Sequence, residues 1–252
     1  IDVAAERARR PAPRPRGDGP FALHALPTAV PLFETTLAPD APAWLGEHRV
    51  HGVALAAAPV FLELAQAAAR MAHGARARQV ETFAIHAPLV VRDEGTLVQI
   101  ELGSGSESSF RIHAREADTG SGNAPAAWRL CASGRLADAG PLGAAVGGTP
   151  LGLDALAATL GPVTAGDAFY ARLATRGIAL GASFNGLRRA HRRDGEALAW
   201  IELPAWLAGD AVTWAHPALL DAALQSLGLC VPDDGEAGDS YLLTGVERAQ
   251  LD

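Results

Sequence analysis

The sequence contains no lysine, and it is poor in several residue types that mark particular protein classes. Its 252 residues include two cysteines, one methionine and 6% aromatic residues, and all 21 basic residues are arginine. Cys131 and Cys230 are far apart and each lies in an apolar run, which does not predict a disulfide framework. Two buried thiols are typical of a reducing compartment, so we expect a cytoplasmic protein.

Long apolar runs and an excess of positive charge are also missing. The most apolar stretch, from Gly52 to Ala69, is interrupted by Glu63 and Gln66 and does not predict a membrane span. The Arg- and Pro-rich beginning holds no apolar core with a cleavage site, so we expect no secretion signal there. A net charge of -7 argues against a nucleic-acid partner, because phosphate binding requires clustered positive charge.

The first half of the chain predicts one helix and a sheet. Residues 1–20 carry few large apolar groups and are predicted to be a linker. Within residues 21–138, apolar spacing from Pro59 to Met71 predicts a helix that stops at Gly74. Alternating apolar residues predict strands over 30–37, 79–89, 96–102, 109–115 and 127–136.

A similar pattern repeats in the second half. Residues 139–150 are rich in Gly, Ala and Pro, which predicts a second linker. In residues 151–252 we expect helices over 151–160, 167–176 and 216–227, with a stop at Gly228, and strands over 184–192 and 197–203. Two units of helix plus sheet predict a duplicated α+β architecture.

Standard catalytic signatures are absent from the sequence, which contains neither a nucleophile elbow nor a complete dinucleotide fingerprint. His48 and His51 are the closest pair of histidines, but no nearby Cys, Asp or third His completes a metal site. We therefore expect no metal ion.

Four other segments resemble the dehydratase domains of modular type I polyketide synthases. LGEHRVHG at residues 45–52 is similar to the HxxxG motif of that family, and HPALLDAALQ at 216–225 is similar to its DxxxQ motif. GIALGASFNGL at 177–187 resembles the family pattern GxxYGPxFxGL, and SYLLTGVERAQL at 240–251 resembles a YLPxGxxR stretch. The four segments occur in the family's order, which makes chance agreement much less probable than for one motif.

The resemblance implies a fold, a site and a reaction. The fold is a double hot-dog, in which each half wraps a sheet around a central helix and one active site lies between the halves. The reaction is the dehydration of a 3-hydroxyacyl thioester to a 2,3-enoyl thioester on an acyl carrier protein. In it His48 removes the C2 proton, and Asp221, kept protonated by a dry pocket, protonates the departing hydroxyl.

The other candidate residues support this pair. Gln225, four residues after Asp221, shares its helix face and could orient its carboxyl group. The backbone at the start of the first helix could donate to the thioester oxygen. Through the resemblance we assign substrate-binding or supporting roles to Gly52, Ala58, Pro59, Leu180, Gly181, Ala182, Phe184 and His216. His51 is expected to be a flanking residue.

The resemblance also has implications for partners. The substrate would arrive on the phosphopantetheine arm of the carrier protein, with no other cofactor. The partners would be that carrier and neighbouring synthase domains, with a homodimer as one assembly, and no membrane is involved. The family adds strands beyond Leu251, so the second half is expected to be short at its end.

The motifs depart from the family pattern at several positions. Ala57 and Ala58 occupy the places of a proline and a glycine in the first motif, and Leu180 and Ala182 replace a tyrosine and a proline in the third. We expect both third-motif changes to alter the pocket. Relatives of this fold shift a double bond or close a pyran ring, so isomerase and cyclase activities are alternatives. A non-catalytic structural or carrier-docking role would predict loss of His48 or Asp221, and both are present.

Overall fold

The computed structural model describes residues 19–74, 78–103, 108–116, 127–138, 152–231 and 241–250. The two predicted linkers, residues 1–20 and 139–150, lie outside these ranges except for residues 19 and 20.

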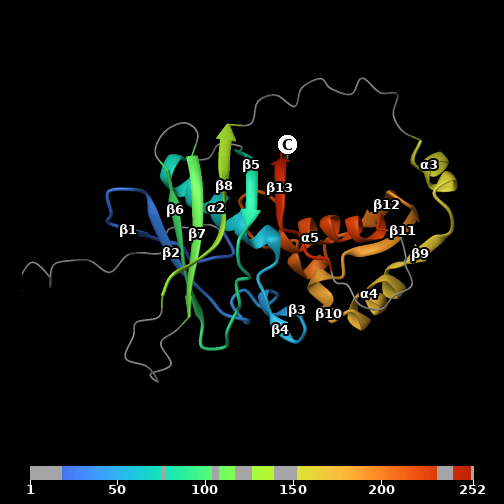
Figure 1. Ribbon diagram of the computed structural model, residues 1–252, viewed down its shortest axis with the longest axis horizontal. Coiled ribbons are helices and arrows are strands. Elements are labelled where there is room, and N and C mark those ends of the chain that lie inside the picture. The colour runs from blue at the N-terminus through green and yellow to red at the C-terminus, as the bar shows by residue number, and fades with distance from the viewer. Residues whose placement is uncertain are drawn as a thin grey trace, which may run out of the picture.

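A seven-stranded antiparallel sheet forms the larger part of the structure (Figure 1). Its strand order is β1-β2-β6-β7-β8-β5-β13. The inner strand β6 alternates strictly between buried and half-buried residues, so one face of the sheet is apolar. The strands are β1 (His24–Leu26), β2 (Leu32–Leu37), β5 (Arg78–Ile85), β6 (Thr96–Leu102), β7 (Ser108–Glu116), β8 (Arg129–Asp138) and β13 (Gly245–Ala249).

Helix α2 (Ala58–His73) packs on the apolar face of this sheet and contacts β5, β6 and β7. Its side chains are buried from Pro59 to Ala69, as expected for the central helix of such a unit. Pro59 is tolerated in the first turn, where a backbone N–H has no helical acceptor. The helix ends at Gly74, whose φ of 84° favours glycine, so the predicted stop is confirmed.

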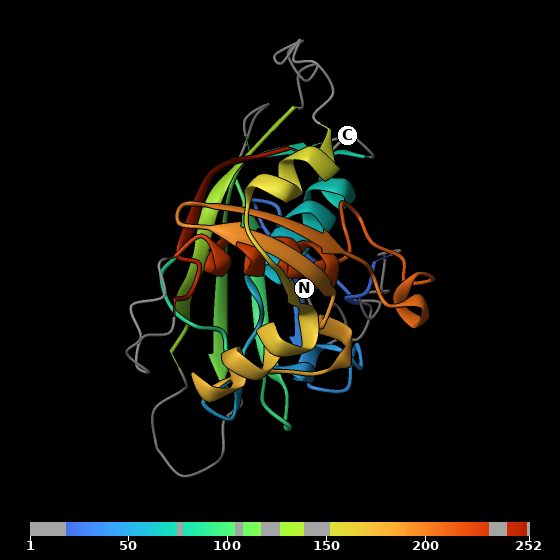
Figure 2. The same cartoon turned by 90° about the vertical axis from the view of Figure 1, so that its right-hand side faces the viewer.

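A smaller three-stranded sheet and three helices form the other part of the structure. The sheet has the order β12-β11-β9. Helix α5 packs against α2, whereas α3 and α4 lie on the side away from the large sheet (Figures 1 and 2). The elements are α3 (Leu153–Thr159), β9 (Val163–Ala165), α4 (Gly166–Thr175), β11 (Leu187–Arg193), β12 (Glu196–Ile201) and α5 (Pro217–Gln225). None of the described helices is both long and apolar enough to cross a bilayer.

Strand pairing joins the two halves at two places. β3 (His48–Val50) and β4 (Val53–Ala54) form a hairpin, and β10 (Ile178–Leu180) from the second half pairs with β3. β13 pairs with β5 and so extends the large sheet. Strands from residues 151–252 are therefore part of the same framework as the first half.

Several predicted boundaries in the second half differ from the structure, and 3₁₀ turns explain two of them. The strand predicted from Phe184 begins at Leu187, because residues 182–184 form a 3₁₀ turn in which the Phe184 N–H donates to the Gly181 carbonyl. The helix predicted to run to Leu227 and stop at Gly228 ends at Gln225, and a 3₁₀ turn follows over Ser226–Leu229. Such tightening at a helix end is common.

Candidate active site

His48 begins β3, and the hairpin that follows determines how its ring is held. The two turn residues, His51 and Gly52, have φ angles of 48° and 80°, as a type I′ turn requires. The turn brings Leu55 back beside His48, and the Leu55 N–H donates to the His48 carbonyl at 3.0 Å. Gly52 therefore allows the tight turn of the hairpin, and it does not line the cavity described below.

The His48 ring is fixed in one tautomer by the backbone. Its Nδ1 lies 3.1 Å from the carbonyl oxygen of Leu55. Because a carbonyl oxygen only accepts, Nδ1 carries the proton and Nε2 keeps a lone pair. The ring also makes an edge contact with Phe184, at 5.5 Å between centroids. His48 can thus act as a base through Nε2.

Asp221 lies on α5, in the other half of the chain, and is only 8% exposed. Gln225 Nε2 donates to its Oδ2 at 2.6 Å, the contact expected for residues four apart on a helix. Burial raises the pKa of the Asp221 carboxyl above its usual range, while nearby His48 and the Gln225 hydrogen bond offset part of the rise. Asp221 is therefore suited to hold a proton and donate it.

His48 and Asp221 line the same cavity, which has a volume of about 590 Å³. Most other lining side chains are apolar and come from both halves, among them Phe61, Ile178 and Leu224. Residues 241–244, which precede β13, complete the wall. The cavity can therefore hold an acyl chain against a base and an acid.

The structure brings some of the predicted supporting residues to this cavity and leaves others outside it. Ala58, Leu180 and Gln225 line it together with His48 and Asp221. The Ala58 N–H is the first of α2 and has no acceptor within the helix, so it is available to a ligand. The predicted supporting residues that do not line this cavity are Gly52, Pro59, Gly181, Ala182, Phe184 and His216.

The expectation that Ala182 shapes this pocket was wrong. Ala182 lies in the 3₁₀ turn after β10 and lines a separate, more polar cavity with Tyr170 and Trp206. Leu180, two residues earlier, is paired with His48 across β10 and β3 and does face the main cavity. Of the two third-motif substitutions, only Leu180 contributes to the wall of the cavity that His48 and Asp221 line.

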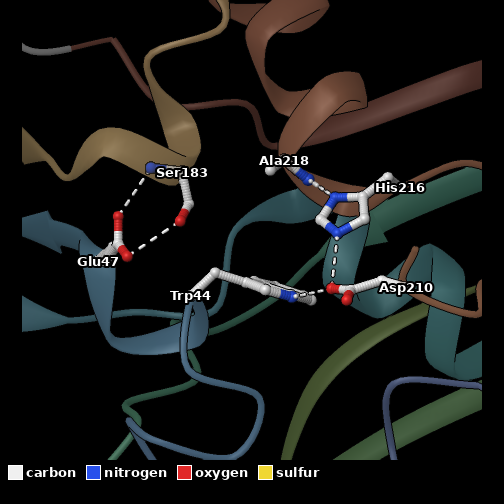
Figure 3. A network of polar contacts seen from close by, with 6 residues as sticks. All are labelled: Trp44, Glu47, Ser183, Asp210, His216 and Ala218. Carbon is white, nitrogen blue, oxygen red and sulfur yellow. Dashed lines mark hydrogen bonds and ion pairs between the residues drawn. The ribbon is translucent and has the colours of Figure 1, made fainter. Parts of the chain in front are cut away.

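His216 supports the helix that carries Asp221. It is 4% exposed, and its Nδ1 accepts from the Ala218 N–H at 3.1 Å, which caps α5 (Figure 3). Its Nε2 lies 3.2 Å from Asp210 Oδ2, which also accepts from the Trp44 indole N–H at 3.1 Å. Burial lowers the pKa of His216, although Asp210 opposes this shift. A neutral ring suits its role as a cap.

Several polar residues near the site were not identified from the sequence. His86 lines the cavity and contacts Ser133 Oγ at 2.8 Å through Nε2. The hydroxyl of Tyr170 accepts from the Leu187 N–H and donates to the Phe184 carbonyl. Glu47, next to His48, accepts two hydrogen bonds from Ser183. Only the position of Glu47 beside a motif histidine was visible in the sequence.

Comparisons with known proteins agree with this geometry. A family model described as "Polyketide synthase dehydratase domain" matches residues 22–115, and one described as "Polyketide synthase dehydratase N-terminal domain" matches residues 148–252. The polyketide synthase GfsE of Streptomyces halstedii is 38% identical over 205 residues. The chain belongs to the polyketide synthase dehydratase family. The alignment with GfsE covers 78% of this dehydratase-family chain but only 5% of the synthase.

Other relatives and solved structures support the same membership. The dehydratase chain is 34% identical over 192 residues to the pikromycin synthase component PikAII of Streptomyces venezuelae, covering 73% of the chain and 5% of PikAII. The dehydratase domain from the CurK module of curacin synthase is similar in structure, with a TM-score of 0.75 and 27% identity. The match covers 91% of this chain and 80% of the CurK domain. The expected α+β double hot-dog fold is confirmed.

Proposed function

We propose that this dehydratase domain removes water from a 3-hydroxyacyl thioester and forms a 2,3-enoyl thioester during polyketide chain elongation. The observation that carries the proposal is the pairing of His48, with a free Nε2, and Asp221, with a raised pKa, in one apolar cavity. A base and an acid of this kind are what elimination of water requires.

The elimination uses each group once. His48 Nε2 takes the proton from C2, and the C2–H electron pair forms the C2–C3 double bond. The C3–O bond breaks as Asp221 gives its proton to the leaving oxygen, which departs as water. The result is an imidazolium beside a carboxylate, and proton exchange with solvent restores the starting states. Burial in the apolar wall raises the pKa of Asp221, which favours the protonated form that this step requires.

Binding of the thioester follows from the start of α2. The Ala58 N–H, at the positive end of the helix dipole, would donate to the thioester oxygen as negative charge develops there. We propose that the acyl chain arrives on the phosphopantetheine arm of an acyl carrier protein and that the chemistry uses no further cofactor. Neighbouring synthase domains are the other proposed partners, and a homodimer is the proposed assembly.

The solved relatives support the assignment of a histidine and an aspartate. Two CurK dehydratase structures are of inactive mutants, one with a histidine replaced by phenylalanine and one with an aspartate replaced by asparagine. Those domains are 26% and 27% identical to this chain. Our proposal gives the equivalent chemistry to His48 and Asp221.

A second candidate is a double-bond shift, alone or with ring closure. It is favoured by Leu180, which lines the cavity as an apolar residue where the family has a tyrosine. His48 would remove a C4 proton from a 2,3-enoyl thioester and return a proton to C2, which gives the 3,4-enoyl isomer. In a substrate with a distal hydroxyl, addition of its O–H across the C2–C3 double bond, with the oxygen bonding to C3 and a proton to C2, would give a cyclic ether instead.

Turnover of defined substrates tests the proposal. The domain is incubated with 3-hydroxyacyl and 2,3-enoyl thioesters on a carrier protein, with and without a distal hydroxyl, and the products are identified by mass spectrometry and NMR. We expect the 3-hydroxyacyl substrates to yield 2,3-enoyl thioesters. Conversion of the enoyl substrates alone would instead support the isomerase or cyclase, and unchanged substrates would contradict both.

A further inference from the structure

The four residues directly before His48 contact the second half of the chain through two side chains. Glu47 accepts from the Ser183 N–H at 2.8 Å and from the Ser183 hydroxyl at 2.9 Å (Figure 3). Trp44 donates to Asp210, which holds the His216 ring that caps α5. The segment 44–47 is thus fixed both to the turn after β10 and to the helix that carries the acid.

The Glu47 contact continues to Asp221 through adjacent residues. Ser183 is 2% exposed, and the next residue, Phe184, is fully buried with its ring edge against His48. The Phe184 carbonyl accepts from Gln225 Nε2 at 3.3 Å, and the same Nε2 donates to Asp221. A continuous series of hydrogen bonds and covalent neighbours therefore links the residue before the base to the acid.

We propose that Glu47 is a positioning residue that sets the placement of His48 relative to Asp221 across the two halves. This inference rests on the dehydration proposed above. Glu47 does not line the cavity, so it acts through Ser183 and Phe184 and not on the substrate. Trp44 provides a second connection to the same helix by way of Asp210 and His216.

The chemistry of the contact suits this role. A carboxylate that accepts two hydrogen bonds forms charge-assisted bonds, which are shorter and stronger than neutral ones. Burial of Ser183 shields them from competition with water. Gly181 also permits the approach, since a Cβ at that position would overlap the Glu47 carboxylate, and its N–H donates to the Glu47 carbonyl at 2.8 Å.

Four variants separate positioning from general stability. Glu47→Ala removes both bonds to Ser183, Glu47→Gln keeps an acceptor for one of them, and Ser183→Ala keeps the backbone bond. Trp44→Phe removes the indole N–H but retains an aromatic ring. The matched control is Glu101→Ala, which removes another partly exposed carboxylate, one paired with Arg111 on the large sheet.

The measurement is steady-state elimination from a 3-hydroxyacyl carrier protein, together with thermal melting. A shift of about 1 Å between reacting groups can reduce a rate by on the order of 100-fold. We therefore expect Glu47→Ala to lower kcat by about 10- to 100-fold while KM changes by less than about threefold, with smaller losses for the other three variants. Glu101→Ala should match the parent. If Glu47→Ala does not fold, Glu47→Gln and Ser183→Ala decide the outcome.

A kcat within about twofold of the parent in the Glu47 and Ser183 variants would overturn the inference, provided that the parent is active. A parent that eliminates water from no 3-hydroxyacyl thioester would contradict the proposed function instead. The positioning claim then remains testable by crystallography of Glu47→Gln and Ser183→Ala. We expect the Phe184 and His48 side chains to move relative to Asp221, and unchanged positions in both variants would overturn the claim.

Discussion

Asp221→Asn tests the role of the acid with little change in shape. Asparagine retains an oxygen that can accept the Gln225 hydrogen bond, which measures 2.6 Å in the parent. It has no proton that it can give to a leaving hydroxyl group. Burial raises the pKa of the parent carboxyl and so favours its protonated form, which the substitution removes.

The expected size follows from general acid catalysis. A positioned acid contributes on the order of 10²- to 10⁴-fold, which is about 3–5 kcal/mol of transition-state stabilisation. We expect kcat to fall within that range. The free energy of unfolding should change by less than about 1 kcal/mol, because the hydrogen bond is kept and no cavity forms.

The assay combines elimination with proton exchange in D₂O. Removal of the C2 proton from a 3-hydroxyacyl thioester, or of the C4 proton from an enoyl thioester, requires only His48 and should continue in the Asp221→Asn variant. Deuterium uptake is followed by mass spectrometry alongside enoyl formation. Elimination above about one tenth of the parent rate would refute the acid role. Loss of exchange together with elimination would count against separate roles for the two residues.

Four further predictions concern the groups around this acid. His48→Ala should abolish turnover and His51→Ala should not, because only His48 lines the cavity; activity in the first and its loss in the second would mean that the motif is misassigned. His216→Ala should destabilise the fold by about 2–4 kcal/mol in denaturant titrations, since it removes a helix cap and a buried ring. Burial lowers the pKa of His216 and raises that of Glu63, which accepts from two backbone N–H groups. Stability that depends on neutral His216 is therefore lost as the pH falls below 6.5, and stability that depends on protonated Glu63 is lost as the pH rises above 4.5. Glu63→Gln should reduce the loss of melting temperature as the pH rises above 4.5, and an unchanged pH profile would contradict the role of Glu63 in that loss. Leu180→Tyr should lower any 3,4-enoyl or cyclic product relative to the 2,3-enoyl product in NMR assays, because it makes the cavity wall more polar.

Local sequence patterns predicted the long elements well. The strand over residues 96–102 has the predicted bounds, since strict alternation of apolar residues defines both of its faces. Helix α2 was predicted to stop at Gly74 because glycine tolerates the backbone conformation found there. Short elements such as β3 and β10 were not predicted, because they are stabilised by pairing with each other across about 130 residues of sequence.

The site was predictable where its residues occur in motifs. His48, Asp221 and Gln225 were identified by spacing and by resemblance, and the structure brings all three to one cavity. Ala182 was misplaced because a 3₁₀ turn directs it to another cavity, and turn type was not evident from GIALGASFNGL. Glu47 was missed because its partner, Ser183, is 136 residues away in the sequence.

The central claim is that, in one elimination, His48 removes the C2 proton and Asp221 protonates the departing C3 hydroxyl group. A crystal structure of the domain with an unreactive 3-hydroxyacyl pantetheine amide tests it most directly. We expect C2 to lie beside His48 Nε2, the C3 hydroxyl within hydrogen-bond distance of the Asp221 carboxyl, and the carbonyl oxygen near the Ala58 N–H. A ligand whose hydroxyl contacts neither residue, or whose chain lies outside the cavity, would contradict the account.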